Sequence, residues 1–169
     1  MRARDLGLAC GSLPPGDRNS LADVPGVTVG HHTLIRGEEI RTGVTAILPH
    51  ADRMFREKLP AAAHVLNGFG KSVGLVQAEE LGEIETPILL TNTFGVAACA
   101  EALVRHAVAE EPRIGRRTST VNPVVLECND GHLNDIQALA VTAEDAAAAI
   151  AAAGPDFASG AVGAGTGMS

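Results

Sequence analysis

The sequence predicts a mixed α/β (α+β) fold. Short runs rich in Val, Ile and Leu follow Pro or Gly and are typical of buried strands. Two long Ala-rich segments carry apolar residues at helical spacing, and they alternate with the predicted strands. Strands separated by helices indicate this fold class. At 169 residues the chain is long enough for one domain with a core, so we expect 1–169 to be a single domain, although an incomplete one.

The first elements follow an ordered or semi-ordered N-terminal segment. Residues 1–20 are rich in Gly, Pro, Asp and Asn, which predicts an extended N-terminal arm. Leu21–Val29 predicts a turn that leads into a short strand, which Thr33–Ile35 continues. Arg36–Glu39 predicts a hairpin turn, and Arg41–Leu48 predicts a second strand that the next proline ends.

The middle of the chain mixes loops with short elements. Ala61–Leu66 is apolar and runs into Asn67–Gly70, whose glycines predict a loop. Ser72–Glu80 could be helix or strand, and a short helix is favoured because Gln and Glu are good helix formers. Ile88–Leu90, directly after a proline, predicts a buried strand.

The second half holds the clearest helices. Phe94–Glu111 carries apolar residues at helical spacing, and a proline follows it and ends the predicted helix. Val124–Leu126 predicts an internal strand. Thr142–Ala153 predicts a second helix, with Thr142 as N-cap and acidic residues in the first turn.

The last segment, 158–169 (ASGAVGAGTGMS), is rich in glycine. It lacks the lysine of a phosphate-binding GxxxxGK loop, so we expect a structural turn. A domain seldom stops inside such a segment. We therefore expect this chain to be a fragment whose other half is elsewhere.

Composition excludes several function classes. Hydrophobic residues make up 46% and charged residues 20%, which is typical of a globular protein. A net charge of −7 disfavours binding to nucleic acid or to an anionic membrane. The chain has four Phe but no Trp or Tyr, which disfavours a stacking surface for single strands. No segment reaches the roughly 20 apolar residues of a membrane helix.

The cysteines and histidines indicate no metal site or cofactor. Cys10, Cys99 and Cys128 show no CxxC spacing, so we expect reduced thiols. No signal peptide is visible, and a cytoplasmic location is expected. The six histidines form no HExxH or other ligand spacing, and no GxSxG elbow is present.

The most informative stretch is Val121–Ile136 (VNPVVLECNDGHLNDI). The predicted strand runs directly into Glu127, and Asn129–Gly131 follows as a turn. A carboxylate at a strand end, next to a tight turn, is held rigidly, and binding groups tend to occupy such places. The alternative, which this motif alone favours, is a solvated strand-end charge beside an ordinary turn.

Two further segments have alternative interpretations. Asn67–Gly70 could shape a ligand pocket with its backbone amides, or it could be a plain loop. Thr91–Thr93 stands between a strand and the long helix, where Asn92 or Thr93 is expected to be the N-cap. The functional alternative is a helix N-terminus that faces a substrate carboxylate or an oxyanion.

Seven segments together resemble one family. In order they are RARDLGL, DVPGVTVGH, RTGVTAILPH, NGFGK, EELGEIETPILLTNT, NPVVLECNDGHLNDI and GAVGAGTGM. They resemble the N-terminal part of the L-aminopeptidase/D-esterase (DmpA-type) family, which includes the β-aminopeptidases. The resemblance implies a self-processing N-terminal-nucleophile hydrolase without a cofactor. It also implies a four-layer αββα sandwich, similar to Ntn-hydrolases but differently connected, and a homo-oligomer.

The same resemblance assigns site residues. Glu127 matches the carboxylate that receives the amino group of a small peptide, amide or ester substrate. Asn129 falls where some members carry a Tyr that helps to bind the oxyanion. Asn67 and Gly68 match a loop near the pocket. The family's nucleophilic Ser and its partners lie beyond the GAGTGM segment, so the missing C-terminal half would supply them. This chain alone is then expected to be inert.

Three hypotheses remain at this stage. The chain is the N-terminal fragment of a self-processing aminopeptidase, or it is a non-catalytic standalone subunit or binding module of the same fold. The third hypothesis is a metal-dependent hydrolase that uses His31, His32 and His50.

Overall fold

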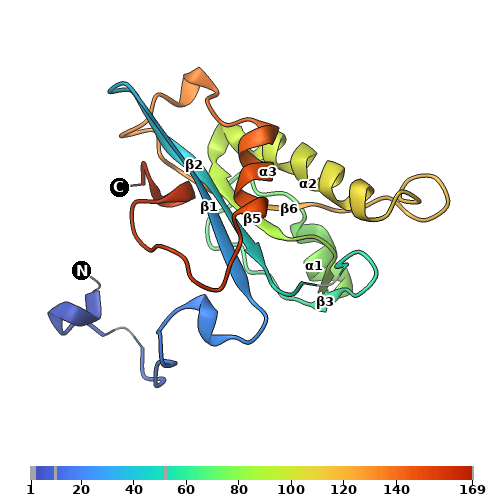
Figure 1. Ribbon diagram of the computed structural model, residues 1–169, viewed down its shortest axis with the longest axis horizontal. Helices are drawn as coiled ribbons and strands as arrows, with labels where there is room; N and C mark the ends of the chain where they lie inside the picture. The colour runs from blue at the N-terminus through green and yellow to red at the C-terminus, as the bar shows by residue number, and fades with distance from the viewer. Residues whose placement is uncertain (1–2, 10, 52, 169) are drawn as a thin grey trace.

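A four-stranded mixed sheet organises the protein (Figure 1). The computed structural model describes residues 3–9, 11–51 and 53–168, so Cys10 and the start of the predicted arm lie outside the described residues. Three strands that lie side by side are antiparallel to their neighbours, and the fourth, at one edge of the sheet, runs parallel to the strand beside it. In spatial order the strands are β1 (Thr28–Arg36), β2 (Ile40–Leu48), β5 (Ile88–Asn92) and β6 (Val124–Cys128).

Two helices cover one face of the sheet, as Figure 1 shows: α2 (Val96–Glu110) and α3 (Ala143–Ala151). The main core lies between these layers and includes the fully buried Val44, Leu89 and Val125. A Cβ atom on Gly30 of β1 would lie 2.1 Å from the Ala149 carbonyl oxygen of α3. Only glycine therefore allows this helix to pack so closely on the strand.

The last described residues lie on the opposite face of the sheet, away from α2 and α3 (Figure 1). The Gly163 amide donates to Thr33 Oγ1 at 2.8 Å, and the Ala164 amide donates to Thr45 Oγ1 at 3.1 Å. The glycine-rich segment forms one 3₁₀ turn here, Gly163–Gly165, so it serves as a structural turn.

A second, smaller core lies on the same face, over β5 and β6. Its buried members are Met54, Ala78, Ile84 and Val124. Two of these residues come from short elements that cover the strands. Ala78 lies in α1 (Leu75–Leu81), and Ile84 lies in a two-stranded antiparallel sheet of β3 (Leu59–Pro60) and β4 (Glu83–Ile84).

The described part of the N-terminal arm is mostly exposed and contains 3₁₀ turns at Ala3–Leu6 and Leu21–Asp23. Arg18 ties it to the loop after α3, because its Nη1 donates to the Pro155 carbonyl at 3.2 Å and to Asp156 Oδ1 at 2.9 Å. Among the described residues, no helix has both the length and the apolar character needed to cross a membrane.

The helices begin slightly later than the sequence predicts. α1 begins at Leu75 and not at Ser72, because Val73 pairs with β6 through two backbone hydrogen bonds to Val125 of 2.9 and 3.2 Å. α2 begins at Val96, after a 3₁₀ turn over Thr93–Gly95. Thr142 caps α3 as predicted, within a capping box.

Candidate functional site

Glu127 lies near the end of β6, and its backbone is fixed from both sides. Across the parallel ladder it is paired with Thr91 of β5. On the outer edge its amide donates to Ser72 Oγ at 3.2 Å, next to the Val73 bridge. The side chain is half-buried, so it is not a charge pointing freely into solvent. The strand end therefore holds this carboxylate in one place.

The junction between β5 and α2 holds one oxygen of this carboxylate. Asn92, almost fully buried, accepts a hydrogen bond from the Gly95 amide at 2.7 Å and so caps the turn before α2. The cap places the next residue, Thr93, beside β6, where its Oγ1 donates a hydrogen bond to Glu127 Oε1. Thr93 thus orients the carboxylate while Asn92 has the capping role.

The other carboxylate oxygen of Glu127 faces the loop Asn67–Gly70, which the sequence predicts as a possible pocket wall. A Cβ atom on Gly70 would lie 3.2 Å from Glu127 Oε2, so the glycine keeps the approach to this oxygen open. Asn67 shapes the loop, because its Oδ1 accepts from the Phe69 amide at 2.9 Å and its carbonyl accepts from Gly70 at 3.3 Å. Lys71 Nζ stands 3.3 Å from the centroid of the Phe69 ring.

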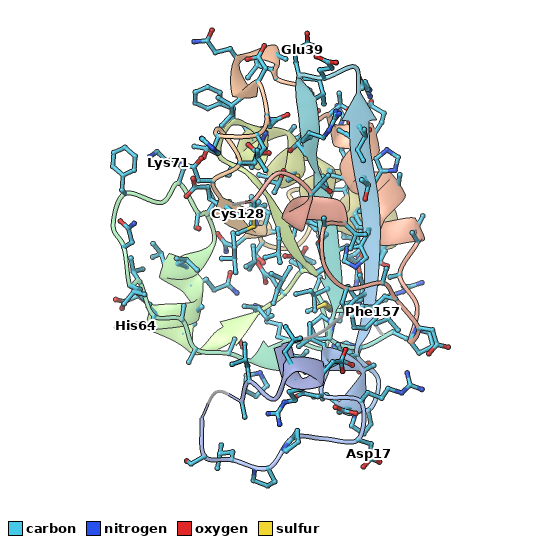
Figure 2. The ribbon with its side chains drawn as sticks, turned by 90° about the vertical axis from the view of Figure 1, so that its left-hand side faces the viewer. Asp17, Glu39, His64, Lys71, Cys128 and Phe157 are labelled. Atoms are coloured by element: carbon cyan, nitrogen blue, oxygen red, sulfur yellow. The ribbon has the colours of Figure 1, made fainter. Side chains whose placement is uncertain are left out.

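Figure 2 shows this loop from His64 to Lys71 standing away from the sheet. Behind it lies a pocket of about 780 Å³. The four residues singled out from the sequence, Glu127, Asn129, Asn67 and Gly68, all line it. They come from segments about 60 residues apart in the chain, so the fold gathers them at one site.

Asn129 lies at the exposed rim of this pocket. Its Oδ1 accepts from the Gly131 amide at 2.9 Å, which closes the turn after β6. Its side-chain amide nitrogen is then the group that can donate to a ligand. Gly68 contributes backbone only, and a Cβ atom there would meet nothing within 4 Å.

The sequence reasoning missed several parts of the site. The loop Asn67–Gly70 was predicted as a possible pocket wall, and Thr91–Thr93 as a cap or as a helix N-terminus that faces a ligand. Neither Thr93 nor Ser72 was predicted as a partner of Glu127. The sequence reasoning also missed the apolar floor of the pocket, which includes Ile88 and Leu126. The polar run Thr91–Thr93 directly after a buried strand was the one signal that could have pointed to a partner for Glu127.

The two described cysteines are poor nucleophiles. Burial raises the pKa of Cys99 to about 11 and that of Cys128 to about 11. Both thiols are therefore protonated at neutral pH, and Cys128 Sγ donates to the Thr91 carbonyl at 3.1 Å.

The histidines proposed as metal ligands are held in separate contacts. His31 Nδ1 lies 2.9 Å from Thr45 Oγ1, His32 Nε2 lies 3.1 Å from Asp145 Oδ1, and His50 Nε2 lies 3.1 Å from the Glu57 carbonyl. Among residues 3–9, 11–51 and 53–168, no three His, Cys, Asp or Glu side chains gather in a way that could hold a metal ion.

The family model described as peptidase family S58 matches residues 19–169. The chain belongs to peptidase family S58. Two curated relatives of this S58 chain are β-peptidyl aminopeptidases. The one from Sphingosinicella microcystinivorans is 40% identical over 99% of this chain, and the one from Sphingosinicella xenopeptidilytica is 36% identical over 99%. Each match covers 43% of the relative, so this S58 chain spans less than half the length of either.

Solved structures superpose closely on this chain. The PH0078 protein from Pyrococcus horikoshii has a TM-score of 0.95 and 51% identity, over 100% of this chain and 50% of that one. A β-aminopeptidase from a Burkholderia species has a TM-score of 0.88 and 46% identity, over 99% and 48%.

A third structure is the L-aminopeptidase D-Ala-esterase/amidase from Ochrobactrum anthropi, with a TM-score of 0.86 and 35% identity over 99% of this chain and 49% of that one. It is described as a prototype for the serine aminopeptidases and a new variant of the Ntn-hydrolase fold. The predicted family and the mixed α/β, Ntn-hydrolase-like fold class are both confirmed.

Proposed function

We propose that this S58 chain is the amine-recognising N-terminal part of a self-processing serine aminopeptidase. The observation that carries the proposal is the carboxylate of Glu127, which Thr93 holds by one oxygen while the other faces the pocket beside Gly70. A fixed, partly buried carboxylate is a suitable partner for a substrate ammonium group, because charge-assisted hydrogen bonds are about twice as strong as neutral ones. The relatives' names as aminopeptidases support this reading.

The substrates proposed are small peptides, amides or esters with a free N-terminal amine. Glu127 binds the ammonium group and so places the scissile carbonyl at the pocket rim. There Asn129 donates its side-chain amide to the oxyanion, a contact worth roughly 3 kcal/mol in transition states of this kind. Asn67 and Gly68 form the wall that limits how the substrate lies.

The attacking hydroxyl comes, in this proposal, from an N-terminal Ser in polypeptide outside the chain. An amine-activated Ser attacks the carbonyl, the leaving amine or alcohol departs, and water hydrolyses the acyl-enzyme. The S58 chain covers about half of its relatives, which leaves room for such a half. We further propose that residues 1–169 form one incomplete domain, completed by that half within a homo-oligomer. The cytoplasmic location expected from the cysteines stays a prediction.

The test is amine binding by the chain itself. L-Alaninamide and N-acetyl-L-alaninamide are titrated into ¹⁵N-labelled protein, and the shifts of amides around β6 are followed. Alaninamide is expected to bind, with an affinity that Glu127→Gln lowers about tenfold to hundredfold, because a hydrogen bond to a charged group is lost. Glu80→Gln, an exposed carboxylate on α1, is the matched control and should change nothing.

Equal binding of the acetylated compound, or an unaltered affinity in Glu127→Gln, would refute the proposed role. The standalone-subunit alternative is separated by turnover. Joined to the C-terminal half that its relatives contain, the chain should hydrolyse amino-acid p-nitroanilides, whereas alone it should not. A standalone subunit would gain no activity from that half.

A further inference from the structure

The turn after β6 contains a buried carboxyl group that has no part in the proposed reaction. Asp130 is 1% exposed and directly follows Asn129 at the pocket rim. Its Oδ1 accepts a hydrogen bond from Asn134 Nδ2 at 3.3 Å. Its Oδ2 is also buried, but it has no hydrogen-bond partner among the residues that the structure describes. One oxygen of this carboxyl group is therefore held and the other is left over.

The backbone around Asp130 is held on both sides. The Asp130 carbonyl accepts from the amides of Leu133 and Asn134 at 3.1 and 3.0 Å. Asn134 Oδ1 accepts from the Arg41 amide at 3.0 Å, which ties the turn to the start of β2. The unpaired oxygen thus belongs to a fixed turn and not to a loose loop.

An unpaired oxygen at this depth calls for a partner. Buried polar groups nearly always have one, and an unsatisfied group destabilises the fold. The shortage exists in either protonation state, because an ionised Oδ2 needs a donor and a protonated one needs an acceptor. Within the part of the chain that the structure describes, Asp130 belongs to no group of three His, Cys, Asp or Glu side chains that could hold a metal ion. The expected partner is therefore polypeptide outside the described residues.

The glycine-rich end of the described chain passes directly beside this carboxyl group. A Cβ atom on Gly167 would lie 3.0 Å from the Cβ of Asp130 and 1.9 Å from the Arg41 carbonyl oxygen, so only glycine lets the backbone pass here. Gly167 is buried, whereas Met168 is exposed. This chain covers 43% of each curated relative, and in the proposed function further polypeptide follows it. That polypeptide would start within a few residues of Oδ2.

Resting on the proposed function for the existence of that polypeptide, we propose that Asp130 Oδ2 is the docking point for the segment that follows Met168. A backbone N–H or a hydroxyl group of that segment donates to Oδ2, and a hydrogen bond to a carboxylate is stronger than one between neutral groups. Because Asp130 directly follows Asn129, the same contact holds the C-terminal half against the rim of the pocket.

The first test measures whether one substitution changes the melting temperature with opposite signs in two forms of the protein. Asp130→Asn replaces the carboxyl group with an amide of the same shape. In the chain alone it removes an unpaired buried carboxylate, so Tm is expected to rise by roughly 2–6 °C. In the chain joined to the C-terminal half it removes the acceptor of the docking bond, so Tm is expected to fall by roughly as much. Asp17→Asn, on the exposed N-terminal arm, is the matched control and should leave both values unchanged.

The second test measures amide hydrogen exchange in the joined protein, and it does not require the chain alone to melt cooperatively. Asp130→Asn should make the first amides after Met168 exchange about tenfold faster, while α3 stays protected. Asn134→Ala is the matched control, because it loosens the same turn and keeps the acceptor. It should leave the exchange after Met168 much less affected.

Each outcome decides the proposal. A Tm shift of the same sign in both forms, or unchanged exchange after Met168, would overturn the docking role, and so would equal effects of Asp130→Asn and Asn134→Ala. The proposed function is measured separately, by the turnover of the joined protein and its loss in Glu127→Gln. Loss of turnover in Glu127→Gln without any effect of Asp130→Asn leaves amine recognition standing and overturns the docking point. The reverse result overturns the role of Glu127 alone.

Discussion

Thr93 Oγ1, in the 3₁₀ turn that follows β5, donates a hydrogen bond to Glu127 Oε1 of the neighbouring strand β6. The bond joins the start of the α2 region to the end of β6, and it determines which carboxylate oxygen is left for a ligand. The proposed amine site therefore depends on a hydroxyl group as much as on the acid.

Replacing Thr93 tests this dependence. Thr93→Val removes the donor and keeps the shape, so Glu127 loses its orientation and amine affinity is expected to fall about threefold to tenfold, the worth of one net hydrogen bond. Thr93→Ser keeps the donor and should retain most of the affinity. Alaninamide titration measures both, with the melting temperature as a check on folding. Equal affinity in Val and Ser variants would contradict the positioning role.

Two neighbouring glycines make a matched pair for the loop. Gly70→Ala places a methyl group 3.2 Å from Glu127 Oε2, which crowds the ligand-facing oxygen. We expect amine affinity to fall about fivefold, because overpacking typically costs about 1 kcal/mol or more. Gly68→Ala meets nothing within 4 Å and should bind amines normally. If both variants bind alike, the approach to Oε2 does not pass Gly70.

The contact between β1 and α3 makes a prediction about stability. Gly30→Ala places Cβ 2.1 Å from the Ala149 carbonyl oxygen and 2.6 Å from the Ala153 nitrogen, so α3 has to shift. We expect a loss of about 3 kcal/mol, at the upper end for overpacking, which lowers Tm by roughly 6–12 °C. Gly154→Ala has open space and serves as control in the same thermal melt. An unchanged Tm in Gly30→Ala would show that the helix packs less closely than described.

The buried thiols predict an alkaline limit to stability. The pKa of Cys99 and that of Cys128 are raised by burial from 9.0 to about 11 in the folded state. In the unfolded chain these thiols ionise at lower pH than in the folded protein. Their burial therefore costs no stability below pH 9, and the free energy of unfolding falls as the pH rises from 9 to 11. Urea melts of a Cys10→Ser variant should show this fall, and replacing Cys99 and Cys128 with Ala should flatten it. The two thiols should also react slowly with iodoacetamide at pH 8, since the thiolate is the reactive form.

Local patterns in the sequence were sufficient for the four strands of the main sheet, the helix α3 and its Thr142 cap, and the strand-end position of Glu127. They were insufficient for β3 and β4, because strands of two residues are too short to show an alternating pattern. The later start of α1 depends on Val73 pairing with β6, a tertiary contact that outweighs the local helix preference of Ser72–Glu80.

The pocket floor was hidden for a different reason. β6 is an edge strand and not the internal strand that its sequence predicts, because, among the described residues, only the single bridge to Val73 lies on its outer side. β5 and β6 are nevertheless apolar on both faces, since both faces are covered, so their sequence does not reveal which side chains face a core and which face a ligand. The partner of Glu127 depends on strand register, which places Thr91 opposite Glu127 and Thr93 just beyond. That register is set by packing between segments about 35 residues apart, which no local pattern encodes.

The glycine-rich turn on the second sheet face also has a consequence for assembly. A Cβ atom on Gly43 would lie 2.5 Å from the Gly163 carbonyl oxygen, so this turn lies as close to β2 as a backbone can. Any further layer stacked over β1 and β2 would rest on that thin backbone spacer instead of on the strands. A bulky side chain substituted into the turn would hold that further layer away from β1 and β2, although the new side chain would contact neither Glu127 nor the pocket.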